Sequence, residues 1–127
     1  MTLPRRSRLS GHAAFSRVFQ HAAVSTDLSF KVLGCVSDQA VSRLGMAVSR
    51  QVDKRAVQRN RIKRIVRESF RGQYLSAPRH SSLDIVVLPR RHAVSMDNKQ
   101  LFEQLSRHWR RIEERTEGTS PFSQAEQ

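Results

Sequence analysis

The sequence predicts an α+β fold, an α/β sandwich in which a small central β-sheet packs with about three helices. Two observations predict it. Hydrophobic residues repeat with helical and strand periods along the chain, in the order helix, strand, strand, helix, strand, helix. The 127 residues suit one domain, and the single Cys35 cannot form an internal disulfide. A domain of this length can bury enough surface to fold without one.

The first half of the chain is expected to hold one helix and two strands. Ser10 can cap the helix, and apolar residues at i, i+3, i+4 and i+7 share one face of it: Phe15, Val18, Phe19 and Ala22. Residues 28–36 alternate as a strand does, with Leu28, Phe30 and Val32 on one side. A polar turn at 37–42 leads to a second alternating run at 44–50. Two such runs joined by a short turn predict an antiparallel pair.

The second half is expected to hold helix, strand and helix. Residues 54–71 have helical periodicity, and Gly72 is a natural stop after them. Residues 83–88 form a continuous apolar run, typical of a strand covered on both faces. Asp97 can cap the last helix, with Gln100 completing a capping-box-like pair. The apolar stripe of that helix consists of Leu101, Phe102, Leu105, Trp109 and Ile112.

Composition sets the expected boundaries. We expect one domain over residues 1–116, with a basic arm at 1–8, and a disordered tail at 117–127, which has little to pack. No apolar stretch approaches the roughly 20 residues that a membrane span needs. The basic N-terminus lacks the apolar segment of a secretory signal. Since one unpaired cysteine fits a reducing compartment, we expect a soluble, cytoplasmic protein.

The positive charge indicates the partner. Lysine and arginine number 23 against 11 acidic residues, for a formal net charge of +12 at pH 7. Self-repulsion of this size costs stability, and binding of a polyanion is the usual reason for it. Nucleic acid is favoured over an acidic membrane surface because no lipid anchor or basic amphipathic anchor is present.

The helix at 54–71 concentrates this charge. Between residues 54 and 67 it carries seven basic residues and no acidic one. Each can neutralise a phosphate and release a counterion. The alternative is a solvated helix face, but such a face usually mixes charge signs.

No catalytic or metal site is recognisable in the sequence. The acidic residues are scattered, whereas a two-metal nuclease needs several converging carboxylates, although distant residues can still meet in a fold. The histidines and Cys35 lack zinc-site spacing, and the glycines form no phosphate-binding loop. We therefore expect a binding protein with no catalytic residue and no metal site of its own.

An aromatic cleft is a further candidate site. Phe15 and Phe19 on the first helix would meet Lys31 on the first strand if the helix packs on the sheet. Rings that stack on bases, beside cations that follow the backbone, are typical of single-strand binding. The alternative, that both rings are ordinary core residues, fits their spacing equally well.

Five parts of the sequence resemble one known family. They are LPRRSRLS with FSRVF, RLGMAVSR, AVQRNRIKRIVRESFR, DIVVLPRR and LFEQLSRHWRRI. In this order, and spanning residues 3 to 112, they resemble the protein subunit of bacterial ribonuclease P. RNRIKR followed by RESFR is the family signature, whereas F-x-x-V-F is weak by itself.

The resemblance implies a subunit of an endoribonuclease in which a catalytic RNA removes the 5′ leader from precursor tRNA. The small basic protein would bind that RNA and the leader, and so favour precursor over mature tRNA. Mg²⁺ would be bound mainly by the RNA, with no organic cofactor, no obligate protein partner and no membrane. The family fold implies a left-handed β-α-β crossover containing the basic helix, whereas the general rule predicts a right-handed one.

The family motifs also imply the site residues. The RNA-binding positions that match the family are Arg50, Arg59, Asn60, Arg61, Lys63, Arg64 and Arg67, and Lys54 and Arg55 in the loop before the helix are added to this RNA-binding set. The leader-binding cleft, between the first helix and the sheet, matches Phe15 and Phe19, and more loosely Lys31 and Leu33. Gln51 departs from the family, which often has a second basic residue there, and Lys54 and Arg55 are candidates to compensate.

Two alternatives belong to other classes. A ribosomal or ribosome-associated structural RNA-binding protein explains the charge and size but not the order of the motifs. A DNA-binding protein would use residues 59–71 as a groove helix, but it usually has a dimer seam or a helix-turn-helix partner. Neither feature is visible in the sequence.

Overall fold

The computed structural model describes residues 3–76 and 82–117. Four strands form one mixed sheet: β1 (Ala23–Thr26), β2 (Phe30–Val36), β3 (Arg43–Met46) and β4 (Leu83–Pro89). The helices are α1 (His12–His21), α2 (Ala56–Tyr74) and α3 (Asn98–Glu117), with short 3₁₀ helices η1 (Arg5–Ser7) and η2 (Arg91–Ser95). The predicted α+β fold is confirmed. Within the described ranges, no helix is long and apolar enough to span a bilayer.

The strand order is β1-β2-β4-β3. β1 and β4 each pair antiparallel with β2, and β3 pairs parallel with β4. The predicted antiparallel pair between the runs at 28–36 and 44–50 is therefore wrong, because β4 lies between them. The alternation of a strand fixes which side chains share a face, but not which strand lies alongside. The strand buried on both faces takes the centre, and β3 is left at the edge.

β1 was not predicted, and a turn at Asp27 explains it. Asp27 Oδ1 accepts hydrogen bonds from the N–H groups of Ser29 and Phe30, both at 2.8 Å. This Asx turn reverses the chain, so that β1 and β2 form a hairpin. Leu28, expected in a strand, lies in the turn with 74% of its surface exposed.

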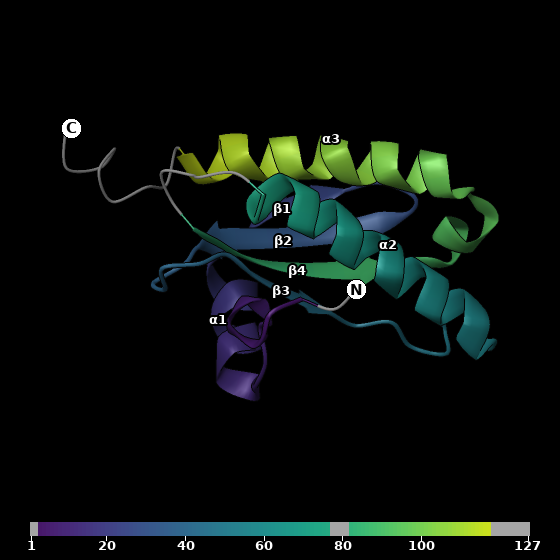
Figure 1. Ribbon diagram of the computed structural model, residues 1–127, viewed down its shortest axis with the longest axis horizontal. Helices are drawn as coiled ribbons and strands as arrows, with labels where there is room; N and C mark the ends of the chain where they lie inside the picture. Colours follow the sequence, from purple (N-terminus) through teal and green to yellow (C-terminus); the bar gives the residue numbers. More distant parts are fainter. Residues whose placement is uncertain (1–2, 77–81, 118–127) are drawn as a thin grey trace.

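The connection from β3 through α2 to β4 joins two adjacent parallel strands. In Figure 1 both strands run from left to right, β4 lies above β3, and α2 passes in front of the sheet. This arrangement is a left-handed crossover, as the family resemblance implied and contrary to the usual rule.

Helices cover both faces of the sheet. On one face α2 and α3 bury the larger core, in which Phe30, Val32, Ile85 and Val87 of the sheet meet side chains of both helices. On the other face α1 covers a smaller cluster: Leu9, Val18, Leu33, Cys35 and Val86. The basic arm packs along β3, since Leu3 is buried in the larger core and Arg8 forms a parallel bridge with Leu44.

Two predicted helix ends are wrong and one is confirmed. The cap of α1 is Gly11, with φ of 89°, rather than Ser10. α2 continues through Gly72 to Tyr74, whose ring packs 5.0 Å from Phe70 and 5.7 Å from Trp109, measured between centroids. That burial offsets the roughly 1 kcal/mol cost of a helical glycine.

The helix boundary that was predicted correctly is the start of α3. Asp97 Oδ1 accepts from the Gln100 N–H at 2.8 Å, and Gln100 Oε1 accepts from the Asp97 N–H at 3.0 Å, which is the predicted reciprocal pair. The helix continues to Glu117. Residues 118–127 of the predicted tail lie outside the described residues.

Candidate nucleic-acid interface

A groove of about 410 Å³ opens between α1, β3 and α2. Its lining residues are Leu3, Arg8, Leu9, Phe15, Leu44, Gly45, Met46, Lys63 and Arg67. One wall is thus aromatic and apolar, and the other carries the two α2 cations at i and i+4. This combination suits a single nucleic-acid strand, with bases against the ring and phosphates beside the cations.

The sheet permits this groove because residue 45 is a glycine. A Cβ on Gly45 would lie 2.6 Å from Cζ of Phe15 and 3.3 Å from Cδ2 of Leu9. Any larger residue would push the Phe15 ring away from β3. The close approach fixes the ring against the strand and leaves its other side toward the groove.

The predicted RNA-binding side chains, on α2 and in the loop before it, divide into available and engaged groups. Among the described residues, no hydrogen bond or ion pair is formed by the side chains of Arg50, Lys54, Asn60, Lys63, Arg64 and Arg67. Of these, Arg64 and Asn60 are exposed, whereas Lys63 and Arg67 are half-buried beside the groove. These six positions can bind phosphates without breaking an internal contact.

Arg61 has the opposite character. Its Nη2 donates to the Val94 carbonyl at 3.1 Å, and its Nη1 donates to the Met96 carbonyl at 3.2 Å and to Asn98 Oδ1 at 2.8 Å. Its Nε donates to Gln58 Oε1 at 3.1 Å. Arg61 therefore joins α2 to η2 and to the start of α3, and its guanidinium is occupied.

Arg55 and Arg59 are engaged near the start of α2. Arg55 forms an ion pair of 2.8 Å with Asp53, and the hydrogen bond from Arg55 lowers the pKa of Asp53 to about 2. Arg59 Nη1 donates to the backbone carbonyls of Asp53 at 2.9 Å and Lys54 at 2.8 Å. Both arginines thus hold the loop that precedes the helix.

That loop forms a second concavity, of about 520 Å³, lined by Arg50, Gln51, Val52, Asp53, Lys54, Arg55 and Arg91. Arg91 was not predicted from the sequence. Its Nε donates to the Gln51 carbonyl at 2.8 Å, although the two residues are forty positions apart. It therefore places a cation beside the position where the family often has a basic residue, in addition to Lys54 and Arg55.

The other predicted cleft residues do not line the Phe15 groove. Phe19 is half exposed on α1. Lys31 is half-buried on β2, opposite Leu88 and Thr26 and on the α1 side of the sheet. Leu33 is 4% exposed and packs beneath α1, so it is a core residue. Arg8 was predicted only as part of the basic arm and Met46 was not predicted at all; the fold brings both to the groove.

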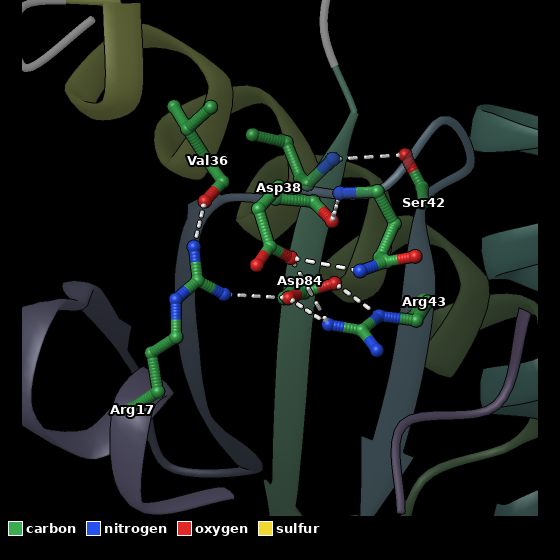
Figure 2. A network of polar contacts seen from close by, with 9 residues as sticks. Arg17, Val36, Asp38, Ser42, Arg43 and Asp84 are labelled. Carbon is green, nitrogen blue, oxygen red and sulfur yellow. Dashed lines mark hydrogen bonds and ion pairs between the residues drawn. The ribbon is translucent and has the colours of Figure 1, made fainter. Parts of the chain in front are cut away.

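An acidic residue missed by the sequence reasoning also acts on this side of the sheet. Asp84 of β4 is fully buried and bonded to Arg17 of α1 and Arg43 of β3 (Figure 2). The available signal was a lone carboxylate in an otherwise apolar strand, because a buried charge requires partners. The network ties α1 to the sheet.

The fold and the groove define a class, that of small basic α+β proteins suited to bind nucleic acid. Comparison with known proteins narrows the class. The family model described as Ribonuclease P matches residues 3–113. The ribonuclease P protein component of Methylococcus capsulatus is 40% identical over 117 residues, which cover 92% of this chain and 89% of the relative. That of Yersinia enterocolitica is 37% identical, covering 87% and 91%.

Solved structures agree. A Staphylococcus aureus RNase P protein superposes with a TM-score of 0.72 at 30% identity, covering 82% of this chain and 93% of the other. The RNase P protein from Thermotoga maritima gives 0.66 at 32% identity, covering 79% and 92%. This chain belongs to the ribonuclease P protein family.

Membership gives the function. The chain is a protein subunit of the ribonuclease P holoenzyme, which cleaves precursor tRNA. The protein therefore has a role in maturation of the tRNA 5′ end. Proteins of this family work together with an RNA subunit and precursor tRNA. The comparisons give no support to the alternative that the chain is a ribosomal or ribosome-associated protein.

Proposed function

We propose that the chain binds both the catalytic RNA and the 5′ leader, and that the Phe15 groove receives the leader. The observation that supports this most is the position of Phe15 across one groove from Lys63 and Arg67. A leader is single-stranded, so its bases are free to stack on a ring while its phosphates meet the cations. Mature tRNA lacks the leader and gains nothing from the groove.

We propose that the second concavity, at the loop before α2, binds the folded catalytic RNA. Its cations, Arg50, Lys54 and Arg91, form a broad basic surface at the start of α2. None of the described residues that line this concavity is aromatic. Phosphate contacts without stacking fit the backbone of a folded RNA better than an unpaired strand.

Mg²⁺ is proposed to be bound mainly by the RNA. Among the described residues, no group of three or more His, Cys, Asp or Glu side chains could hold a metal ion. The described residues therefore offer no such site for Mg²⁺, and we assign no catalytic step to them. What the protein supplies is positive charge, which reduces repulsion between RNA phosphates. We also propose that no organic cofactor or obligate protein partner is required, and that the protein acts in the cytoplasm.

A cleavage assay tests the proposal. The protein is combined with the cognate catalytic RNA at low Mg²⁺, with precursor or mature tRNA as ligand. We expect the protein to increase cleavage and to strengthen binding of precursor more than of mature tRNA. The protein without RNA is expected to cleave nothing. Equal effects on precursor and mature tRNA would refute the leader-binding role.

A further inference from the structure

The buried cluster around Asp84 has a geometry suited to orient α1. Asp84 is 0% exposed, and Arg43 binds it with both ends of its guanidinium, Nε at 2.8 Å from Oδ1 and Nη2 at 2.6 Å from Oδ2. Arg17 of α1 donates from Nη1 to Oδ2 at 2.9 Å. Figure 2 shows the carboxylate held between the two arginines, which come from different elements.

Arg17 fixes α1 at two points. Its second nitrogen, Nη2, donates to the Val36 carbonyl at the end of β2, at 2.7 Å. The helix is thus joined to β2 and β4 by one side chain. Because the guanidinium is planar, two such bonds fix its orientation as well as its position.

Apolar packing alone leaves α1 weakly anchored. The helix has ten residues, fewer than a helix needs to be stable by itself in water. Val18 is its buried residue, and Ala14 and Phe15 pack only partly against the small cluster. The bonds of Arg17 to Asp84 and to the Val36 carbonyl add two directional contacts to this small apolar surface.

α1 also carries the aromatic wall of the groove. Phe15 lies two residues before Arg17, and its ring touches β3 at Gly45. Lys63 and Arg67 on α2 form the opposite wall. A rotation of α1 would therefore change the distance and angle between the ring and these cations.

Stability is a poor explanation for such a cluster. A buried ion pair loses much of its Coulomb attraction to desolvation, and apolar residues of similar size often stabilise a protein as well or better. What apolar residues do not supply is the directional tie between α1 and two strands.

We propose that Arg17, Asp84 and Arg43 act as positioning residues that hold Phe15 opposite Lys63 and Arg67, and so maintain the preference for tRNA that carries a leader. The inference rests on the proposed function of the groove. Asp84 is inaccessible to RNA, so it acts through Arg17 and the position of α1.

The experiment compares Arg17→Met with Arg107→Met. Both variants lose one arginine charge, but Arg107 is exposed on α3 and has no bond among the described residues. Each full-length protein is assembled with the catalytic RNA, and binding of precursor and mature tRNA is measured. We expect Arg17→Met to lower the precursor-to-mature affinity ratio by about tenfold, the order of one lost base–aromatic stacking contact. Affinity for mature tRNA should change only as much as in Arg107→Met.

A distance measurement separates orientation from stability. Nitroxide labels are placed at Gln20→Cys on α1 and Glu68→Cys on α2, both exposed, in a Cys35→Ala background. The distance distribution between labels should broaden in Arg17→Met and stay unchanged in Arg107→Met. Arg17→Lys keeps the charge but holds one acceptor instead of two, so it should restore part of the affinity ratio. It replaces Arg17→Met if that variant does not fold.

The outcomes distinguish the two proposals. If the unmodified protein shows no preference for precursor tRNA, the proposed function of the groove fails. If that preference exists but both Arg17 variants retain it in full, or the label distances do not change, the positioning role is wrong.

Discussion

Arg61 and Arg64 lie three residues apart on α2, and the structure predicts opposite consequences for their removal. Arg61 donates to four acceptors within the chain, three of them on the segment 94–98. Arg64 is exposed and has no bond among the described residues. Both belong to the basic motif that the family resemblance assigns to RNA binding. Replacing each with alanine therefore separates an internal role from phosphate contact.

The magnitudes follow from these contacts. Removing Arg61 leaves the Val94 and Met96 carbonyls and the Asn98 side chain without their donor. A hydrogen bond to a charged group contributes about 1.5–3 kcal/mol, and the partial exposure of this site lets water replace some of it. We expect Arg61→Ala to lower the free energy of unfolding by about 2–4 kcal/mol, or the melting temperature by about 10 °C. Arg64→Ala should change stability by less than about 0.5 kcal/mol.

The salt dependence of RNA binding gives the second readout. Each phosphate contact adds about 0.7–0.9 to the slope of log affinity against log salt. Arg64→Ala should reduce the slope by about that amount. Arg61→Ala should leave it unchanged at temperatures where the variant is folded. Arg61→Lys keeps the charge but cannot reach the same acceptors, so it should also be destabilised without a change in slope.

The assay combines thermal unfolding with titrations of the catalytic RNA at several salt concentrations. Arg107→Ala on α3 serves as the control for loss of one exposed charge. An Arg61→Ala protein that melts like the unmodified chain, and binds RNA with a reduced slope, would refute the internal role of Arg61.

Three further predictions concern other parts of the molecule. Phe15→Leu should keep the fold but lower the affinity for precursor tRNA more than for mature tRNA; an equal loss in the two titrations would show that the ring is only a core residue. Gly45→Ala should displace the Phe15 ring and destabilise the protein by about 1–3 kcal/mol, measured by denaturant unfolding, whereas an unchanged stability would contradict the close approach of β3 and α1. Burial lowers the pKa of His108 from its ordinary value of 6.5, and the nearby Asp27 carboxylate opposes this shift only in part. Oδ2 of Asp27 lies 2.9 Å from Nε2 of His108 but does not form a well-aligned hydrogen bond with it. Because the unfolded state then takes up a proton first, stability should be constant above about pH 6.5 and fall below it; a His108→Gln protein with the same pH profile in that interval would contradict this.

Local features of the sequence determined the elements that depend on neighbouring residues. The capping box of α3 needs only Asp97 and Gln100, and both of its bonds are present. The run at 83–88, apolar except for Asp84, lies within β4, which is buried on both faces. The basic helix is α2, although the burial of Tyr74 carries it past the glycine predicted to end it. Order of motifs along the chain was also sufficient to identify the family.

The tertiary structure alone decided the strand order and the role of each charge. Alternation sets which face a side chain takes, but the partner of a strand depends on competition for burial among segments far apart in sequence. Lys31 and Leu33 lie two residues apart on one face of β2, yet Leu33 is buried in the cluster beneath α1 and Lys31 is half-buried. Arg61 and Arg64 are equivalent in the sequence, yet three of the four acceptors of Arg61 lie more than thirty residues away. The energy of a charged side chain depends on what surrounds it in space, and that environment exists only after the chain has folded.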